Sequence, residues 1–401
     1  MRNRERIQEI TDKLHEGIKA LFESGKYADY LRTMSKFSSY SFNNTILIAM
    51  QRPDASAVAG FKAWERNFDR HVVKGAKGIA IIQPAPYKKT VEETVLDADG
   101  NTVYNQDGSK MTREVEKIME GYKVGYVFAL EDTEGTPLPS IVSTLNSDVP
   151  NYDEFIDVLK TVSPVPIIYE PINSRANGFF NLETRDIHVD SSLPELQRLK
   201  TTVHEMAHSL LHDKIIGEDQ EANRFEREVC AESVAFTVMS YYGFDTSDYS
   251  FGYIAGWSEG KELKELQSKM SLIQKSSNTL ITSIDKEFLK RRMSEADELT
   301  FKCSEGYIHI QKASDGGYDF SLYDQNLCLI DGGRFDSEQT MDGAAVEIMQ
   351  SLDIDPDAAV LQNDETFQEH LANVATQKDD LSEKYNYDEK QERSCHIRRK
   401  L

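Results

Sequence analysis

One segment, residues 196–213, repeats apolar side chains with the period of a helix. Leu199, Val203, Met206 and Leu210 follow one another at intervals of three or four residues. This spacing aligns them in one stripe, so the sequence predicts an amphipathic helix with one buried face.

A second helical pattern covers residues 218–242 and is followed by Gly243, a residue type that commonly ends helices. Its apolar positions include Phe225, Val229 and Phe236. The sequence therefore predicts two helices that pack on each other through their apolar sides.

The first predicted helix carries the sequence His204-Glu205-x-x-His208. Histidines four residues apart project from the same face of a helix, one turn apart, and can share one zinc ion. Glu205 can then reach a water molecule on that ion without being a ligand, as in H-E-x-x-H metallopeptidases. The alternative is an accidental pair of core histidines beside a surface glutamate. His212 lies roughly 12 Å along the axis from His204, too far to share one tetrahedral ion, and is predicted in solvent or beside a ligand histidine.

A catalytic zinc ion needs a third protein ligand. Glu228 and Glu232 share one face of the second predicted helix. A carboxylate buried among apolar side chains is costly unless it is paired or bound to metal. The alternative is a solvated glutamate face, because Glu221 and Glu226 lie on the same segment.

The two helices resemble the ImmA/IrrE-type zincin-like metallopeptidases. The residues that carry the resemblance are the His-Glu-x-x-His sequence and Glu228-x-x-Ala231-Glu232-x-x-Ala235 on the next helix. The resemblance implies a Zn²⁺ ion, a protein or peptide substrate, Glu205 as the catalytic base and Glu228 as the third ligand. Glu232 would then orient a ligand histidine. The family more often has Asn or Asp at that position, which leaves the assignment between the two glutamates open.

The charge of the chain is distributed unevenly. The net charge is −22 over 401 residues, yet residues 1–90 hold 16 Lys and Arg against 9 Asp and Glu, a net of +7. The remaining residues carry 30 against 59, a net of −29. A basic region on an acidic chain indicates an anionic partner for that region.

The basic region combines predicted helices over residues 4–24 and 27–38 with a predicted strand over 79–83. Between them, aromatic residues alternate with Lys, Arg and Gly, a composition typical of surfaces that bind single-stranded nucleic acid. The alternative is that Phe61 and Trp64 belong to the core of a small α+β domain.

Several spaced elements in residues 5–130 resemble the N-terminal domain of ArdC-type antirestriction proteins. They are the sequences Tyr-Ser-Phe-Asn-Asn, Gln-x-Pro-x-Ala, Gly-x-x-x-Trp and Arg-x-Val-x-Lys-Gly-x-x-Gly-Ile, in this order. The resemblance implies a domain that binds single-stranded DNA, and the order of domains resembles LtrC-like proteins of mobile elements. The candidate DNA contacts are Tyr40, Asn43, Asn44, Phe61, Trp64, Arg70, Lys74 and Lys77.

The expected fold class is α+β and multidomain. A single-stranded-DNA-binding domain (1–135) precedes a zincin-like metallopeptidase domain (145–295), a small ββ(β)α module (300–355) and a charged tail (356–401). We predict short strands near His188, which is expected to be a strand residue and not a ligand, and one of these strands could hold an extended peptide. Residues 132–139 are expected to form a linker.

The remaining features limit the class of protein. No apolar run approaches the length of a membrane span, the first residues are charged, and the four cysteines have no ligand spacing. These observations favour a cytoplasmic protein without a membrane partner. The expected function is single-stranded DNA binding combined with zinc-dependent peptide hydrolysis, for antirestriction or for cleavage of a regulator. The alternative is a non-enzymatic antirestriction protein with a structural or vestigial zinc site.

Overall fold

The chain forms two compact units, Met1–Ile284 and Asp285–Leu401, each described here by itself. The computed structural model describes residues 2–23, 26–95, 101–105, 107–135, 152–244, 258, 261–314, 316–356 and 358–362. Within these ranges no helix has both the length and the apolar character needed to cross a bilayer. The mixture of helices and antiparallel strands agrees with the predicted α+β class.

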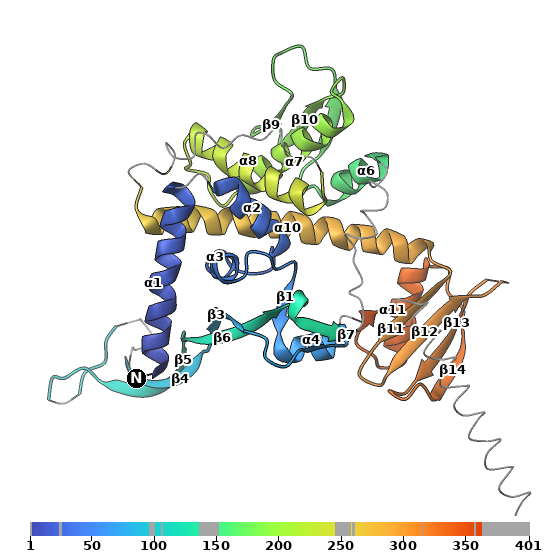
Figure 1. Cartoon of the computed structure of the whole chain (residues 1–401), viewed down its shortest axis with the longest axis horizontal. Coiled ribbons are helices and arrows are strands. Elements are labelled where there is room, and N and C mark those ends of the chain that lie inside the picture. The colour runs from blue at the N-terminus through green and yellow to red at the C-terminus, as the bar shows by residue number, and fades with distance from the viewer. Residues whose placement is uncertain are drawn as a thin grey trace, which may run out of the picture. The chain divides into compact units, whose positions relative to one another are not determined.

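The first part of the first unit contains helices and short strands (Figure 1). They are α1 (Arg2–Glu23), α2 (Tyr27–Lys36), α3 (Phe42–Gln51), β1 (Val58–Gly60), α4 (Phe61–Phe68), β2 (Arg70–Val72), β3 (Ile79–Pro84), β4 (Tyr87–Thr94), β5 (Thr112–Met119), β6 (Tyr122–Ala129), a short 3-10 helix η1 (Leu130–Asp132) and β7 (Thr133–Gly135). The first two helices begin and end within two residues of the predicted bounds.

Strands β1, β6 and β3 form an antiparallel sheet in that order. Successive side chains of a strand point to opposite faces, and Ile79, Ile81, Val127 and Ala129 all point to the buried one. They pack with Ile48 of α3, and α1 and α3 lie over this face in Figure 1. The opposite face of the sheet carries the alternate residues of β6.

Two side-chain amides of α3 bind the backbone of β3. Asn44 accepts a hydrogen bond from the Ile82 N–H and donates one to the Ile82 carbonyl, each at 2.9 Å. Gln51 makes the same pair of bonds with Ala80, at 3.0 and 2.9 Å. A sheet edge needs partners for its backbone groups, and these two amides supply them for β3.

The expected linker over 132–139 is wrong for its first residues. Thr133–Gly135 is strand β7, which pairs antiparallel with β2. Arg70 of β2 stabilises the pair, because its guanidinium donates to the Thr133 hydroxyl, to the Thr133 carbonyl and to the Gly135 carbonyl. Between these elements, β4 and β5 form an eight-pair antiparallel hairpin.

The described residues in the second part of the first unit form three strands and four helices. They are α6 (Tyr152–Val162), β8 (Ile167–Glu170), β9 (Gly178–Asn181), β10 (Asp186–Asp190), α7 (Glu195–His212), α8 (Arg224–Tyr241) and α10 (Leu263–Glu295), the last of which crosses the boundary between the units. The sheet has the order β8-β10-β9, with β10 parallel to β8 and antiparallel to β9. Strand β9 is therefore an edge strand.

Helices α7 and α8 pack on each other as predicted, and Val229 and Phe236 are buried, but the expected packing of Phe225 is wrong because its side chain is 48% exposed. Helix α8 begins six residues later than expected, because Asn223 caps it. The Asn223 side chain accepts from the Glu226 N–H, and the Glu226 carboxylate accepts from the Asn223 N–H.

The described residues of the second unit form a five-stranded antiparallel sheet with helix α11, together with the end of α10, and this fold has more strands than the predicted ββ(β)α module. Its elements are β11 (Glu298–Lys302), β12 (Tyr307–Lys312), β13 (Tyr318–Tyr323), β14 (Leu329–Phe335), α11 (Met341–Ser351) and β15 (Val360–Leu361). The strand order is β14-β13-β12-β11-β15. The sequence prediction missed β11, whose Leu299 and Phe301 pack with Ile348 of α11. Strand β15 lies beyond residue 355, where the charged tail was expected to begin, and residues 363–401 lie outside the described part.

Candidate metal centre

The two histidines of α7 direct the same ring nitrogen toward one point. His204 Nε2 and His208 Nε2 are 3.1 Å apart, and the rings are nearly perpendicular at 77°. The opposite side of α7 is held in the core by Leu199, Val203 and Met206, which are at most 2% exposed. Burial of this apolar stripe fixes the face that presents the histidines.

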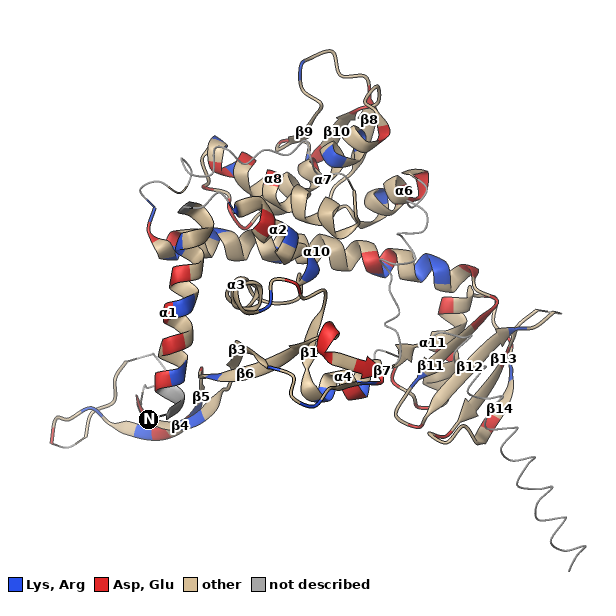
Figure 2. Ribbon diagram, viewed as in Figure 1, with Lys and Arg blue, Asp and Glu red and all other residues tan. Residues whose placement is uncertain are grey.

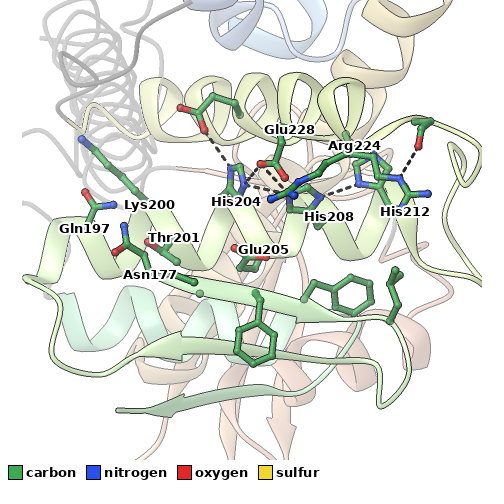
Figure 3. A pocket seen from close by; sticks show the side chains of 18 residues that line it. Asn177, Gln197, Lys200, Thr201, His204, Glu205, His208, His212, Arg224 and Glu228 are labelled. Carbon is green, nitrogen blue, oxygen red and sulfur yellow. Dashed lines mark hydrogen bonds and ion pairs between the residues drawn. The ribbon is translucent and has the colours of Figure 1, made fainter. Parts of the chain in front are cut away.

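Helix α8 adds Glu228 to this point (Figure 3). Its Oε2 atom lies 3.5 Å from His204 Nε2 and 3.8 Å from His208 Nε2. Among the described residues, these three form the group of potential ligands whose donor atoms all lie within 4.8 Å of one another. Two imidazoles and one carboxylate match the donor set of a catalytic zinc site.

Glu232, one turn further along α8, has a different partner. Its Oε2 lies 3.3 Å from His204 Nδ1, the nitrogen that faces away from the shared point. A carboxylate in this place fixes the tautomer and orientation of a ligand histidine. The geometry therefore favours Glu228 over Glu232 as the third ligand.

The electrostatics of the site favour a positive charge. Burial disfavours the imidazolium form of His204, but its hydrogen bonds with Glu228 and Glu232 raise its pKa to about 10. The same contacts, with His204 and with His208, hold the pKa of Glu228 far below its usual range. A site that stabilises imidazolium in this way also suits a metal cation, so the residues present fit a metal ion.

Glu205 lies beside the two histidines and is only 6% exposed. Burial raises the pKa of its carboxyl group, opposed by the charges of His204 and His208 and by a hydrogen bond from the Phe180 backbone. In Figure 3 the Glu205 side chain lies between the candidate metal ligands and strand β9.

Gly178 allows β9 to lie close to α7. A Cβ atom at this position would be 2.7 Å from Thr201 Cγ2 and 2.8 Å from the His188 carbonyl oxygen, closer than real contacts allow. The role of Gly178 was not predicted from the sequence. A glycine at the start of a predicted strand can mark a close approach of two backbones, and this was the one sequence feature that pointed to it.

His212 is buried, so of its two predicted positions the one in solvent is wrong and the one beside a candidate ligand histidine is confirmed. It is 3% exposed, and its Nδ1 lies 3.0 Å from His208 Nδ1. Burial, together with the charges of His208 and Arg227, lowers its pKa to about 3, so His212 is neutral. A neutral His212 can accept a hydrogen bond from the His208 Nδ1–H group, which leaves the lone pair of His208 Nε2 for a metal ion.

A cleft of about 970 Å³ opens onto these residues. The metal-binding face of α7 and the first turns of α8 line one side, and Asn177, Gly178 and Phe179 line the other. The cleft also contains Lys200 and Arg227. Edge strand β9 thus borders a cavity whose floor carries the three candidate ligands and Glu205.

His188 is a strand residue, as predicted, and is not one of the grouped ligands. Its ring nitrogens lie 2.7 Å from Glu170 and 3.2 Å from Asp186, and its ring stacks on Phe179.

Four of the eight expected DNA contacts make contacts within the domain. Trp64 is 1% exposed and its indole N–H donates to the Phe128 carbonyl at 2.9 Å, so it is a core residue and cannot stack on a base. Asn44 binds β3, Arg70 binds β7, and the Tyr40 hydroxyl donates to the Val58 carbonyl.

The remaining expected DNA contacts differ in exposure. Phe61 is 54% exposed, and Lys74 and Lys77 are exposed in the loop before β3. Asn43 is half-buried on α3. Phe61, Lys74 and Lys77 are thus the exposed members of the eight.

Three family models match successive parts of the chain. Residues 4–128 match the N-terminal domain of anti-restriction factor ArdC, and residues 162–265 match the IrrE N-terminal-like domain of the peptidase M78 family. The chain thus has the ArdC-type architecture, an ArdC N-terminal domain joined to an IrrE-type peptidase-like domain. Residues 294–383 match large polyvalent protein-associated domain 16. The donor set and the IrrE-type domain together indicate a metal-ion site.

Individual proteins show more distant similarity. An uncharacterized protein of Bacillus anthracis, pXO2-81, is 28% identical over 316 residues, which cover 71% of this chain and 52% of that protein. The chain thus spans about half the length of this relative. The crystal structures of antirestriction protein ArdC from plasmid R388 are 18% identical in the metal-free form (TM-score 0.35) and 16% identical in the Mn(II)-bound form (TM-score 0.37). The metal-free match covers 61% of this chain and 83% of that one, and the Mn(II)-bound match covers 70% and 96%.

Proposed function

We propose that the IrrE-type domain hydrolyses peptide bonds with a zinc ion held by His204, His208 and Glu228. The observation that carries this proposal is the convergence of two imidazole Nε2 atoms and one carboxylate beside the buried carboxylate of Glu205. A zinc ion in such a donor set supplies Lewis acidity and lowers the pKa of a bound water to about 7.

Glu205 is the general base in this proposal. Burial raises the pKa of Glu205 toward neutral pH, and a general base is most effective when its pKa is close to the pH of the reaction. Glu205 takes a proton from the water that attacks the peptide carbonyl and delivers this proton to the departing amine. A structural metal site would have no use for a buried carboxylate at this place.

The peptide substrate would lie along β9. This strand pairs only with β10 among the described residues, so its other edge has backbone groups available for an extended chain. The cleft between this edge and α8 leads to the candidate ligands and Glu205.

The ArdC-type domain is proposed to bind single-stranded DNA. The match over residues 4–128 and the net charge of +7 over residues 1–90 support this proposal. The combined activity would serve antirestriction or the cleavage of a regulator, in the cytoplasm and on behalf of a mobile element. The proposed domain limits 1–135 and 145–295 enclose the two matched segments.

The test compares cells that produce wild-type protein with cells that produce Glu205→Gln. New peptide N-termini, measured by mass spectrometry, should appear only with the wild type, and any protective or regulatory phenotype should be lost in the variant. A phenotype that the variant retains in full would contradict the peptidase proposal and support a purely DNA-binding antirestriction protein.

A further inference from the structure

The sheet β1-β6-β3 has one face that α1 and α3 do not cover. On β6, Val127 and Ala129 point to the buried face, so Tyr122, Tyr126 and Phe128 point to the other one. Tyr122 is 52% exposed and Tyr126 is 48% exposed. Exposed aromatic rings in a row on one strand are unusual for a surface without a ligand.

Phe61 extends this row of rings. It is the first residue of α4, directly after β1, and its ring centroid lies 5.9 Å from that of Phe128 in an edge-to-face arrangement. Phe61 is 54% exposed. The uncovered face thus presents Phe61, Tyr126 and Tyr122, with the half-buried Phe128 behind Phe61; we call these four residues the aromatic face.

Glycine holds the central ring of the aromatic face in place. A Cβ atom added to Gly78 would lie 3.1 Å from Cβ and from Cδ1 of Tyr126, so the tyrosine packs directly against the glycine backbone. A ring that is both fixed and exposed loses little conformational entropy when it stacks on a ligand.

The charges around the aromatic face suit an anion. Strands β1, β3 and β6 contain no Asp or Glu, although the whole chain has 68 of them (Figure 2). Lys74 and Lys77 are exposed in the loop that leads to Gly78. Neither lysine makes an ion pair with another described residue.

The neighbouring hairpin differs in this respect. Lys88 lies 3.3 Å from Glu116, and Lys117 and Arg113 pair with Glu93. Its cations are therefore partly neutralised, whereas the lysines next to the aromatic face are available to phosphates.

We propose that single-stranded nucleic acid binds across the aromatic face, with bases stacked on Phe61, Tyr126 and Tyr122. Its phosphates lie near Lys74 and Lys77. Rings for the bases and lysines for the backbone are the two components of single-strand binding surfaces on sheets. This inference rests on the proposed DNA binding of the ArdC-type domain, and it assigns that binding to residues other than Trp64, Tyr40 and Asn44.

The test uses the full-length protein and a fluorescent oligothymidine, with affinity measured by anisotropy. Phe61→Ala and Tyr126→Ala should each weaken binding by about 5- to 150-fold, the range for loss of one stacked base. Tyr126→Phe keeps the ring and should bind like the wild type. Tyr104→Ala is the matched control, because Tyr104 is also exposed, at 59%, but lies between strands β4 and β5 and is not part of the aromatic face.

The lysines are tested through salt dependence. Lys74→Gln and Lys77→Gln should each reduce the slope of log affinity against log salt by about 1, because one phosphate contact is lost. Thermal melting of each variant checks that the fold is retained.

Two outcomes separate this inference from the proposal on which it rests. If the wild type binds oligothymidine but Phe61→Ala and Tyr126→Ala behave like Tyr104→Ala, the aromatic face is not the DNA site, while DNA binding stands. If the wild type binds no single-stranded DNA, both proposals fail and the aromatic face is left for a protein partner.

Discussion

The Tyr27 hydroxyl lies 2.9 Å from Ser233 Oγ, and this buried contact joins α2 of the ArdC-type part to the helix that carries Glu228 and Glu232. Each hydroxyl has a further acceptor within reach, the Val229 carbonyl for Ser233 and Met270 Sδ for Tyr27, so either can donate in this contact. A second buried contact, from the Gln274 amide of α10 to the Thr45 hydroxyl of α3, lies nearby in the fold. The helix of the metal centre is thus fixed by residues of the ArdC-type domain.

This contact predicts that the two domains of the first unit unfold together. Tyr27→Phe removes one buried hydrogen bond and should lower the free energy of unfolding by about 0.5–1.5 kcal/mol. Urea denaturation measures the effect, with Tyr104→Phe at an exposed site as control. A loss confined to one of two separate transitions would contradict the coupling.

Glu228 and Glu232 contact different histidine nitrogens, so their removal should have unequal effects on zinc affinity. Glu228→Ala removes the carboxylate that faces both Nε2 atoms, whereas Glu232→Ala removes the partner of His204 Nδ1. Glu232→Ala should weaken zinc binding by about 10- to 100-fold, and Glu228→Ala should weaken it by more. Competition with a fluorescent zinc chelator measures both. The opposite order would make Glu232 the ligand.

Gly178 is expected to control access of substrate but not of metal. In Gly178→Ala the new methyl group would collide with Thr201 and with the His188 carbonyl, and would push β9 away from α7. The value of kcat/KM should fall while zinc content stays unchanged. Gly60→Ala is the matched control, because nothing lies within 4 Å of a Cβ there. Equal activity of the two variants would remove β9 from the proposed substrate site.

The cysteines should differ in reactivity. Cys230 is fully buried on α8, and burial raises the pKa of its thiol to about 12. Because the thiolate is the reactive form, only about one thiol in 10,000 is ionised at pH 8. Iodoacetamide should therefore label the half-buried Cys328 in the native protein and leave Cys230 unlabelled until urea is added. Equal labelling of both in the native state would contradict the burial.

The sequence was most informative where interactions are local. The period of Leu199, Val203 and Met206 predicted α7, and the i, i+4 spacing of His204 and His208 placed both rings on one face. Both features depend on a single helix. Glu228 contacts His204 Nε2, whereas Glu232 contacts His204 Nδ1. Which glutamate meets which nitrogen depends on how α8 packs on α7, and the sequence did not determine this packing.

Long-range contacts explain the errors. The indole of Trp64 finds its acceptor at Phe128, 64 residues away, so its burial could not be predicted from neighbouring residues. Tyr122 and Tyr126 were not predicted as binding residues, because their exposure depends on which face α1 and α3 cover. The start of α8 was an avoidable error, since Asn223 and Glu226 have the spacing of a capping box.

The central claim is hydrolysis that depends on Glu205, and it is tested most directly with purified wild-type and Glu205→Gln protein. Zinc content by elemental analysis and cleavage of a peptide library are measured on the same samples. We expect equal zinc in both proteins and a rate that is about 100- to 10,000-fold lower in the variant, because the change removes the proton acceptor and leaves the three candidate ligands in place. Equal cleavage rates in the two zinc-loaded proteins, or no cleavage by the zinc-loaded wild type, would contradict the account.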